Sequence, residues 1–233
     1  MLDASLSAFH LLLSGDPTLW GIVWLSLATS LAALVLAAPP AIVLGYAIAS
    51  QRFRGRRVVI WLAQATLSLP TVLVGLLLYM LLSRQGPMGQ LQWLFTQQGV
   101  VLGQVVVALP VLVAFALAAV QAADPRYAET AIAHGASRWR TMVTVLHEVR
   151  FAVVAAIISG FGRVISEVGC ALMVGGNIAG QTRTITTAIA LETSKGEFAQ
   201  GIALGMVLIV IALIMNGALM FLQGDAHAAR ERP

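Results

Sequence analysis

Five apolar runs, each about 20 residues or longer, constrain this sequence more than any other feature. They cover residues 19–49, 58–82, 99–122, 151–175 and 201–222. A bilayer core is crossed by about 20 apolar residues in a helix, whereas a membrane strand needs only about ten residues of alternating polarity. With 59% hydrophobic and 10% charged residues, the chain is too apolar for a soluble domain. We therefore expect an all-α integral membrane protein with about five transmembrane helices.

Prolines interrupt three of these runs without adding charge. Pro39 and Pro40 lie in the first run, Pro70 in the second and Pro110 in the third. Neighbouring helices can supply partners for the carbonyl groups that a proline frees, so we expect kinks and not breaks at these positions.

The basic residues predict the orientation in the membrane. Thirteen of the 14 Lys and Arg lie outside the apolar runs, ten on one side and three on the other. The ten are Arg52, Arg54, Arg56, Arg57, Arg126, Arg138, Arg140, Arg150, Arg230 and Arg232, and the three are Arg84, Arg183 and Lys195. The positive-inside rule then places the N-terminus outside and the C-terminus in the cytoplasm. The basic pI, about 10.0, reflects this orientation and does not indicate a nucleic-acid partner.

The remaining segments complete the predicted organisation. Residues 1–18 are expected to form a short interfacial segment, residues 19–222 the transmembrane domain with an inward loop at 123–150, and residues 223–233 a cytoplasmic tail. Cys170, the single cysteine, excludes an internal disulfide and gives no metal cluster. The sequence shows no internal repeat of the kind that secondary transporters contain.

The inward loop contains the stretch ETAIAHGASRWR, residues 129–140, which predicts a helical hairpin. Asp124 can cap a helix that starts at Pro125, Gly135 suits the left-handed residue that ends it, and Ser137 can cap the next helix. The face formed by Ala128, Ala131, Ala133 and Ala136 has little apolar area to bury within this chain. Two interpretations remain from the pattern alone: a connector on the membrane surface, or a helix that docks into a groove of another protein.

A polar stripe interrupts the fourth apolar run. Ser159, Arg163, Ser166, Glu167 and Cys170 recur every three or four residues, so one continuous helix would place them on one inward face. Arg163 and Glu167 can pair across one turn. The pair either fixes this helix against its neighbours or forms part of a translocation pathway, in which Arg163 attracts an anion. Gly160, Gly162 and Gly169 allow other helices to approach closely.

The segment after this run, MVGGNIAGQTRTITTAIALETSKGEF, is rich in groups that can bind a tetrahedral oxyanion. Glycine amides, threonine hydroxyls and one guanidinium are available in Gly175, Gly176, Asn177, Thr182, Arg183 and Thr184. We expect this segment to lie outside the membrane. The same composition also suits a solvated loop without a ligand.

Two resemblances add to this reading. The spacing of Glu129, Ala131 and Gly135 is similar to the EAA loop of bacterial ABC importer permeases, although Thr130 replaces an alanine and His147 and Glu148 replace the usual Leu-Pro. From Glu129 to the end of the fifth run, about 95 residues, the chain resembles tungstate-type permeases of the tungstate and molybdate importer group. The shared runs include GFGRVISEVG, MVGGNIAGQTRT and TTAIALETSKGEF.

The resemblance implies a function and a set of partners. It implies a type I ABC importer permease in a bacterial or archaeal cytoplasmic membrane, with a second copy of itself, cytoplasmic ATPase subunits and an extracytoplasmic oxyanion-binding protein. Glu129, Ala131 and Gly135 would couple to the ATPase, and Arg163, Ser166, Glu167 and Gly169 would form the pathway or gate. The cargo would be tungstate, with molybdate, another oxyanion or a small organic solute such as an amino acid as alternatives.

ATP and Mg²⁺ are expected on the ATPase and not on this chain. The sequence has no G-x-x-x-x-G-K-[ST] motif, and its single lysine, Lys195, falls in an outside loop. We therefore expect a transport subunit that is not itself an enzyme and binds no cofactor. An ATP-independent transporter is disfavoured by the EAA-like loop.

Overall fold

A computed structural model describes the backbone of residues 8, 10–51 and 53–230, with side chains up to Phe221. Every regular element in these residues is helical, which confirms the predicted all-α fold class. The elements are α2 (Pro17–Ser50), α3 (Arg56–Ala65), η1 (Thr66–Ser68), α4 (Thr71–Leu82), η2 (Gly89–Leu91), α5 (Gln97–Gln121), α6 (Pro125–Ala133), α7 (Arg138–Glu148), α8 (Arg150–Ile165), α9 (Gly169–Gly175), α10 (Ile185–Lys195) and α11 (Phe198–Arg230).

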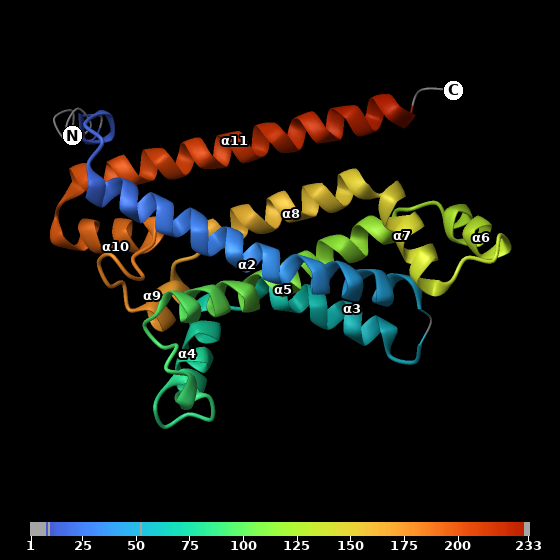
Figure 1. Ribbon diagram of the computed structural model, residues 1–233, viewed down its shortest axis with the longest axis horizontal. Helices are drawn as coiled ribbons and strands as arrows, with labels where there is room; N and C mark the ends of the chain where they lie inside the picture. Colours follow the sequence, from blue (N-terminus) through green and yellow to red (C-terminus); the bar gives the residue numbers. More distant parts are fainter. Residues whose placement is uncertain (1–7, 9, 52, 231–233) are drawn as a thin grey trace.

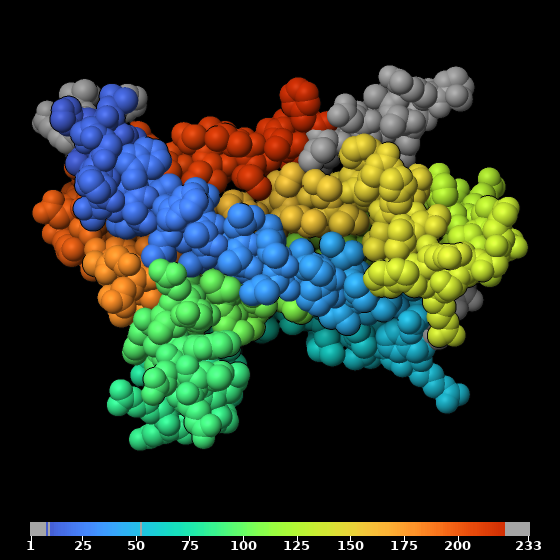
Figure 2. Space-filling view, in the orientation of Figure 1, coloured from blue at the N-terminus to red at the C-terminus, as the bar shows by residue number. Residues whose placement is uncertain are grey.

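Four long helices, α2, α5, α8 and α11, extend along the length of the molecule (Figure 1). The short helices α6 and α7 lie at one end, together with the turn between α2 and α3. Helix α10 lies at the other end, near the start of α2. Helix α4 stands across the bundle, and together with the segment after it projects away from the other helices (Figure 1 and Figure 2).

Three helices are long and apolar enough to cross a membrane individually: α2, α5 and the described part of α11. The predicted number of five is reached only if each of two bent helix pairs counts as one span. Pro39, Pro40 and Pro110 lie inside continuous helices, as expected.

The second predicted span, residues 58–82, was expected to be one helix with a kink at Pro70. That prediction is wrong, because the structure has two separate helices there. Helix α3 ends at Ala65, a 3₁₀ turn follows, and α4 starts after Pro70 at an angle of 96° to the preceding helix. A proline disfavours the helical conformation of the residue before it. Leu69 is accordingly extended, with φ −67° and ψ 133°.

The fourth predicted span, residues 151–175, is also not continuous. Helix α8 ends at Ile165 and α9 starts at Gly169. The chain also bends at the start of this span, where α7 and α8 meet at an angle of 77°. Residues 151–175 contain no proline, so the break between α8 and α9 arises from the contacts of Glu167 and Gly169 that the next subsection describes.

Small residues allow the long helices to pack closely. One core joins α2, α5 and α8 through residues such as Ala37, Ala108 and Val164. A Cβ atom added to Gly45 on α2 would lie 2.7 Å from the Ala116 Cβ and 2.9 Å from the Leu117 amide nitrogen on α5. Two helix backbones come this close in membrane proteins where small residues line the contact.

The described residues extend into both of the predicted terminal segments. Most of the predicted interfacial segment, residues 1–7 and residue 9, lies outside the described residues. Its described part packs through Ala8, Leu11 and Leu12 against a core formed by α2, α10 and α11. At the other end α11 continues to Arg230, beyond the predicted limit at residue 222, and residues 231–233 lie outside the described part.

Candidate functional site

Residues 123–150, which were predicted to face inward, form the helical hairpin that the cap residues predict. The Asp124 carboxylate accepts a hydrogen bond from the Arg126 amide at 2.9 Å, and Pro125 is the first residue of α6. After α6, Gly135 adopts the left-handed conformation with φ 77°, and the Ser137 hydroxyl accepts a bond from the Arg140 amide at 3.4 Å. This local prediction is confirmed by the structure.

The hairpin exposes the residues that the resemblance assigned to coupling. No residue of α6 is buried. Glu129 and Gly135 are exposed and Ala131 is half-buried. Two apolar side chains beside them, Ile132 and Trp139, are 62% and 66% exposed. Sequence reasoning missed these two because it considered only the small alanine face of α6.

At the break in the fourth predicted span, Glu167 is held by three groups. The Arg163 Nη1 donates to its Oε2 at 2.8 Å, and the Cys170 amide donates to its Oε1 at 3.0 Å. The Thr186 hydroxyl donates to its backbone carbonyl at 2.7 Å. We call these contacts the Glu167 clasp. The clasp joins the end of α8 to the start of α9 and to α10.

The predicted polar stripe is therefore wrong beyond Ile165. Arg163 and Glu167 do pair, but α8 ends between them, so Glu167 and Cys170 do not continue its helical face. Glu167 is turned inward, with its side chain 2% exposed, whereas the Arg163 side chain is 36% exposed. The Ser166 hydroxyl donates back to the Gly162 carbonyl at 2.9 Å.

Gly169 and Gly160 pack closely, and Gly162 does not. A Cβ atom on Gly169 would lie 2.6 Å from the Val72 Cγ2 and 3.0 Å from its amide nitrogen, so the break before α9 meets the break before α4. A Cβ atom on Gly160 would lie 2.6 Å from the Leu112 side chain on α5. Around Gly162 the described residues leave open space within 4 Å.

The glycine- and threonine-rich segment is folded, and it buries its threonine side chains although Gly176 and residues 178–181 are exposed. The Thr182 hydroxyl donates to the Gly175 carbonyl and accepts from the Ile178 amide. Thr184 caps α10 through a capping box with Thr187. Thr182 and Thr184 are 0% and 3% exposed. Their hydroxyl groups are thus engaged within the protein in this conformation.

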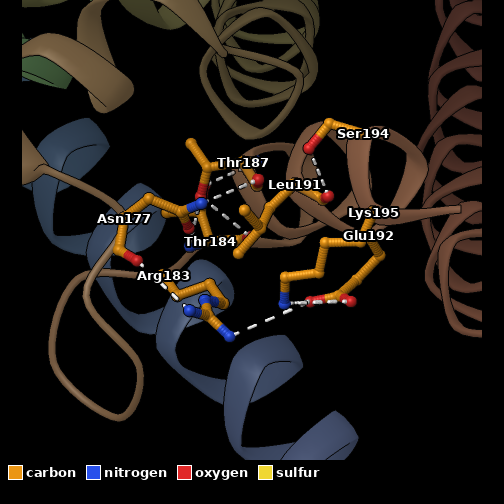
Figure 3. A network of polar contacts seen from close by, with 8 residues as sticks. All are labelled: Asn177, Arg183, Thr184, Thr187, Leu191, Glu192, Ser194 and Lys195. Carbon is orange, nitrogen blue, oxygen red and sulfur yellow. Dashed lines mark hydrogen bonds and ion pairs between the residues drawn. The ribbon is translucent and has the colours of Figure 1, made fainter. Parts of the chain in front are cut away.

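Arg183 also turns toward its own segment (Figure 3). Its Nη2 donates to the Asn177 carbonyl at 3.4 Å, and its Nη1 lies 4.0 Å from the Glu192 carboxylate. Lys195 lies 3.1 Å from the same carboxylate. The Arg183 Nε and the Asn177 Oδ1 are buried without a hydrogen-bond partner among the described residues. Sequence reasoning missed Glu192, whose position three residues before Lys195 on a helix is the available signal.

The remaining glycines of this segment shape its turn. Gly175 ends α9 and contacts Val100 of α5, and Gly176 follows in the left-handed conformation with φ 69° against the Phe95 ring. Asn177 continues with φ 53°. The backbone turns sharply here, so the segment returns toward α10.

The structure thus places the predicted site residues in three regions, two of which meet at α10 through Thr186. The hairpin lies at one end of the molecule and the Arg183 network at the other end with α10 (Figure 1). The Glu167 clasp lies where α8 ends and α9 starts, and it contacts α10 through Thr186. Helix α8, 16 residues long, separates the hairpin from the clasp by about 24 Å. Among the described residues, no three His, Cys, Asp or Glu side chains gather as a metal site would require.

Comparison of the sequence with known proteins shows the family of this chain. Residues 41–224 match the family model described as the binding-protein-dependent transport system inner membrane component. The chain is 38% identical to the tungstate uptake system permease protein of Campylobacter jejuni over 92% of its own length and 90% of the relative. It is 39% identical to a probable anion ABC transporter permease protein of Haloferax volcanii over 82% and 84% of the two chains.

A relative of lower identity is named for the transport of another metal. The chain is 29% identical to the molybdenum transport system permease protein of Escherichia coli K12, over 93% of its length and 97% of the relative. The matches extend through all three regions described above. The chain therefore belongs to the family of inner membrane components of binding-protein-dependent transport systems.

Proposed function

We propose that this chain is the membrane permease of an ATP-driven importer for an oxyanion, with tungstate as the cargo. The observation that carries the proposal is the similarity to the tungstate uptake permease over nearly the whole of both chains. A cationic side chain, Arg163, that is partly exposed within an apolar helix is consistent with an anionic cargo.

The α6–α7 hairpin is the proposed contact with a cytoplasmic ATPase that binds ATP and Mg²⁺. Glu129, Ala131 and Gly135 are exposed or half-buried there, and Ile132 and Trp139 offer apolar side chains that a groove in the partner can cover. A movement of this hairpin would pass along α8 to the Glu167 clasp, because α8 directly joins the two regions.

The proposed importer contains two copies of this chain. An arginine in a span costs about 2.5 to 3.5 kcal/mol when it inserts into lipid, so Arg163 is better placed against a pathway or a second copy. Gly162 and Ser166, its neighbours on the same side, are also exposed. We assign this side of α8 to the interface, with Arg163 and Ser166 facing the pathway and Glu167 and Gly169 supporting them.

The region around Arg183 is the proposed contact with an extracytoplasmic binding protein. Gly176, Asn177 and Arg183 lie at the end opposite the hairpin, while Gly175, Thr182 and Thr184 hold the turn that presents them. This placement agrees with an outside N-terminus and a cytoplasmic C-terminus. The described basic residues Arg54, Arg56, Arg57, Arg126, Arg138, Arg140 and Arg150 all belong to the hairpin end or enter α8 from it.

The cargo is tested by elemental analysis of cells that lack this chain. Deletion should lower intracellular tungsten selectively when tungstate, molybdate and vanadate are supplied at equal trace concentrations, and the wild-type chain should restore it. Selective loss of molybdenum would favour the second candidate, which the 29% identical molybdenum permease supports. Unchanged levels of all three metals, without another importer for them, would overturn the oxyanion proposal.

The role of Arg163 is tested in the same cells. Arg163→Glu should abolish uptake, because a carboxylate at this position repels an anion, while Arg163→Lys should retain part of it. Arg84→Glu, a charge reversal at an exposed position remote from α8, provides the control. Normal uptake by an assembled Arg163→Glu permease would leave Arg163 as a purely structural residue.

A further inference from the structure

The turn between α2 and α3 forms an open, basic surface hollow that the transport proposal does not use. The hollow, about 550 Å³ and largely open to solvent, is lined by Phe53, Arg54, Gly55, Arg56 and Arg57. Three of these five residues are arginines and none is acidic. The lining therefore offers cationic hydrogen-bond donors to an anion.

Only one of the three arginines is engaged within the protein. The Arg56 Nε donates to the Ile48 carbonyl at 2.8 Å and its Nη2 to the Ala49 carbonyl at 3.0 Å, which holds the turn against the end of α2. Arg54 and Arg57 are exposed, and neither side chain makes a hydrogen bond or ion pair with the described residues. Two guanidinium groups thus remain available for a ligand.

An exposed apolar surface starts directly beside these cations. Val58, Trp61 and Leu62 on α3 are 58%, 65% and 50% exposed, and their spacing of three and four residues places them on one helix face. Arg57 lies one turn before Trp61 on the same side. Helix α3 runs at the surface of the molecule, at the end that also contains the hairpin (Figure 1, Figure 2).

The combination distinguishes this region from an ordinary solvated basic loop. A loop that only sets the orientation of a membrane protein needs charge, but it does not need an exposed tryptophan one turn away from an unpaired arginine. Trp is enriched where a bilayer meets water, and Arg side chains bind phosphate groups through paired donors. A ligand with an anionic head and an apolar tail matches both surfaces together.

We propose that this region binds an anionic phospholipid. Its headgroup phosphate contacts Arg54 and Arg57, and one acyl chain lies along Val58, Trp61 and Leu62. This site is separate from the transport pathway and does not depend on the identity of the cargo. It would fix the α2–α3 turn at the surface of the membrane.

The test is a titration of the delipidated full-length chain in detergent with phosphatidylglycerol or phosphatidylcholine, followed by native mass spectrometry. Phosphatidylglycerol should bind more tightly than phosphatidylcholine. Arg54→Ala combined with Arg57→Ala should weaken phosphatidylglycerol binding about 30-fold. Each basic residue near an anionic membrane surface strengthens binding about fivefold, so the loss of two multiplies to this value. Arg84→Ala, which removes an exposed charge from another loop, is the matched control and should bind as wild type does.

Two further measurements make the result decisive. Trp61→Ala should weaken both lipids while the preference for phosphatidylglycerol remains, and the thermal stability of each variant checks that it is folded. Equal binding of the two lipids, or wild-type affinity in the folded double-arginine variant, would overturn the proposal. Displacement of the lipid by millimolar inorganic phosphate would also overturn it, because the site would then recognise a free anion.

Discussion

The α6–α7 hairpin and the Glu167 clasp are stabilised in opposite ways. The hairpin is set by bonds between residues two or three positions apart, and α6 buries none of its side chains. The clasp buries a carboxylate and bonds it to Arg163, to the Cys170 amide and, through its carbonyl, to Thr186. The hairpin is thus locally folded and leaves the surface of α6 exposed, whereas the contacts of the clasp all lie within one chain.

Removing the Glu167 side chain from the clasp should cause the largest loss of stability. We expect Glu167→Ala to lower the free energy of unfolding by about 3 kcal/mol or more, because it leaves Arg163 and the Cys170 amide without their partner. Thermal unfolding of the purified chain in a fixed detergent measures this. The double variant with Arg163→Ala should lose less than Glu167→Ala alone, and a wild-type midpoint for Glu167→Ala would contradict the clasp.

The hairpin should lose partner binding and not stability. Ile132→Ala combined with Trp139→Ala should weaken association with the ATPase by about 2 kcal/mol or more, because exposed apolar anchors contribute most to such contacts. The midpoint of thermal unfolding should stay unchanged. Leu213→Ala on α11 is the control, since Leu213 is also 66% exposed but lies outside the hairpin. ATPase binding equal to wild type would exclude these two side chains as anchors.

Two glycines two positions apart on α8, Gly160 and Gly162, lie on different faces of the helix and test which face is packed inside the protomer. Gly160→Ala should destabilise the chain by about 1 to 3 kcal/mol, because the new methyl group overlaps the Leu112 side chain. Gly162→Ala should not destabilise the protomer, but it should lower the fraction of dimer if this face contacts a second copy. Thermal unfolding and the mass of the detergent-solubilised particle separate the two effects. Equal unfolding midpoints for the two variants would contradict the assigned faces.

The smallest effect is expected from the cap of α7. Ser137→Ala should destabilise the first turn by about 0.5 to 1 kcal/mol, since the hydroxyl that accepts from the Arg140 amide is lost. Hydrogen exchange of the amides in this turn should become faster. Thr144→Ala is the control, because the Thr144 hydroxyl bonds within α7 at 3.0 Å without capping it. Unchanged exchange would show that Gly135 alone sets the turn.

The same comparison explains how much of the molecule the sequence predicts. Asp124, Pro125, Gly135 and Ser137 act on their near neighbours, so their effect is visible in a short stretch. The break before α9 has no such local signal. It depends on Thr186, 19 residues along the chain, and on contact of Gly169 with Val72 of α4. A continuous apolar run therefore predicts helical structure correctly but not its division into two helices.

In the candidate site, too, local features could be predicted from the sequence and features that depend on distant contacts could not. Arg163 and Glu167 were identified because charged residues are rare in apolar helices. Their different exposure could not be predicted, because it depends on where α8 ends. The threonine hydroxyls were predicted to be available, yet packing of α10 against α2 and α11 places them inside the protein. Chemical groups can be read from the sequence, whereas their accessibility is set by tertiary contacts.

The contact of Gly169 with Val72 has a consequence for the order of folding during synthesis. About 90 residues separate the end of α4 from the start of α9. At about 5 to 20 residues per second, the ribosome completes α4 roughly 5 to 20 seconds before the helix on which it packs exists. During this interval the apolar surface of α4 faces lipid or the insertion machinery. The second predicted span can reach its final shape only after the fourth has been made.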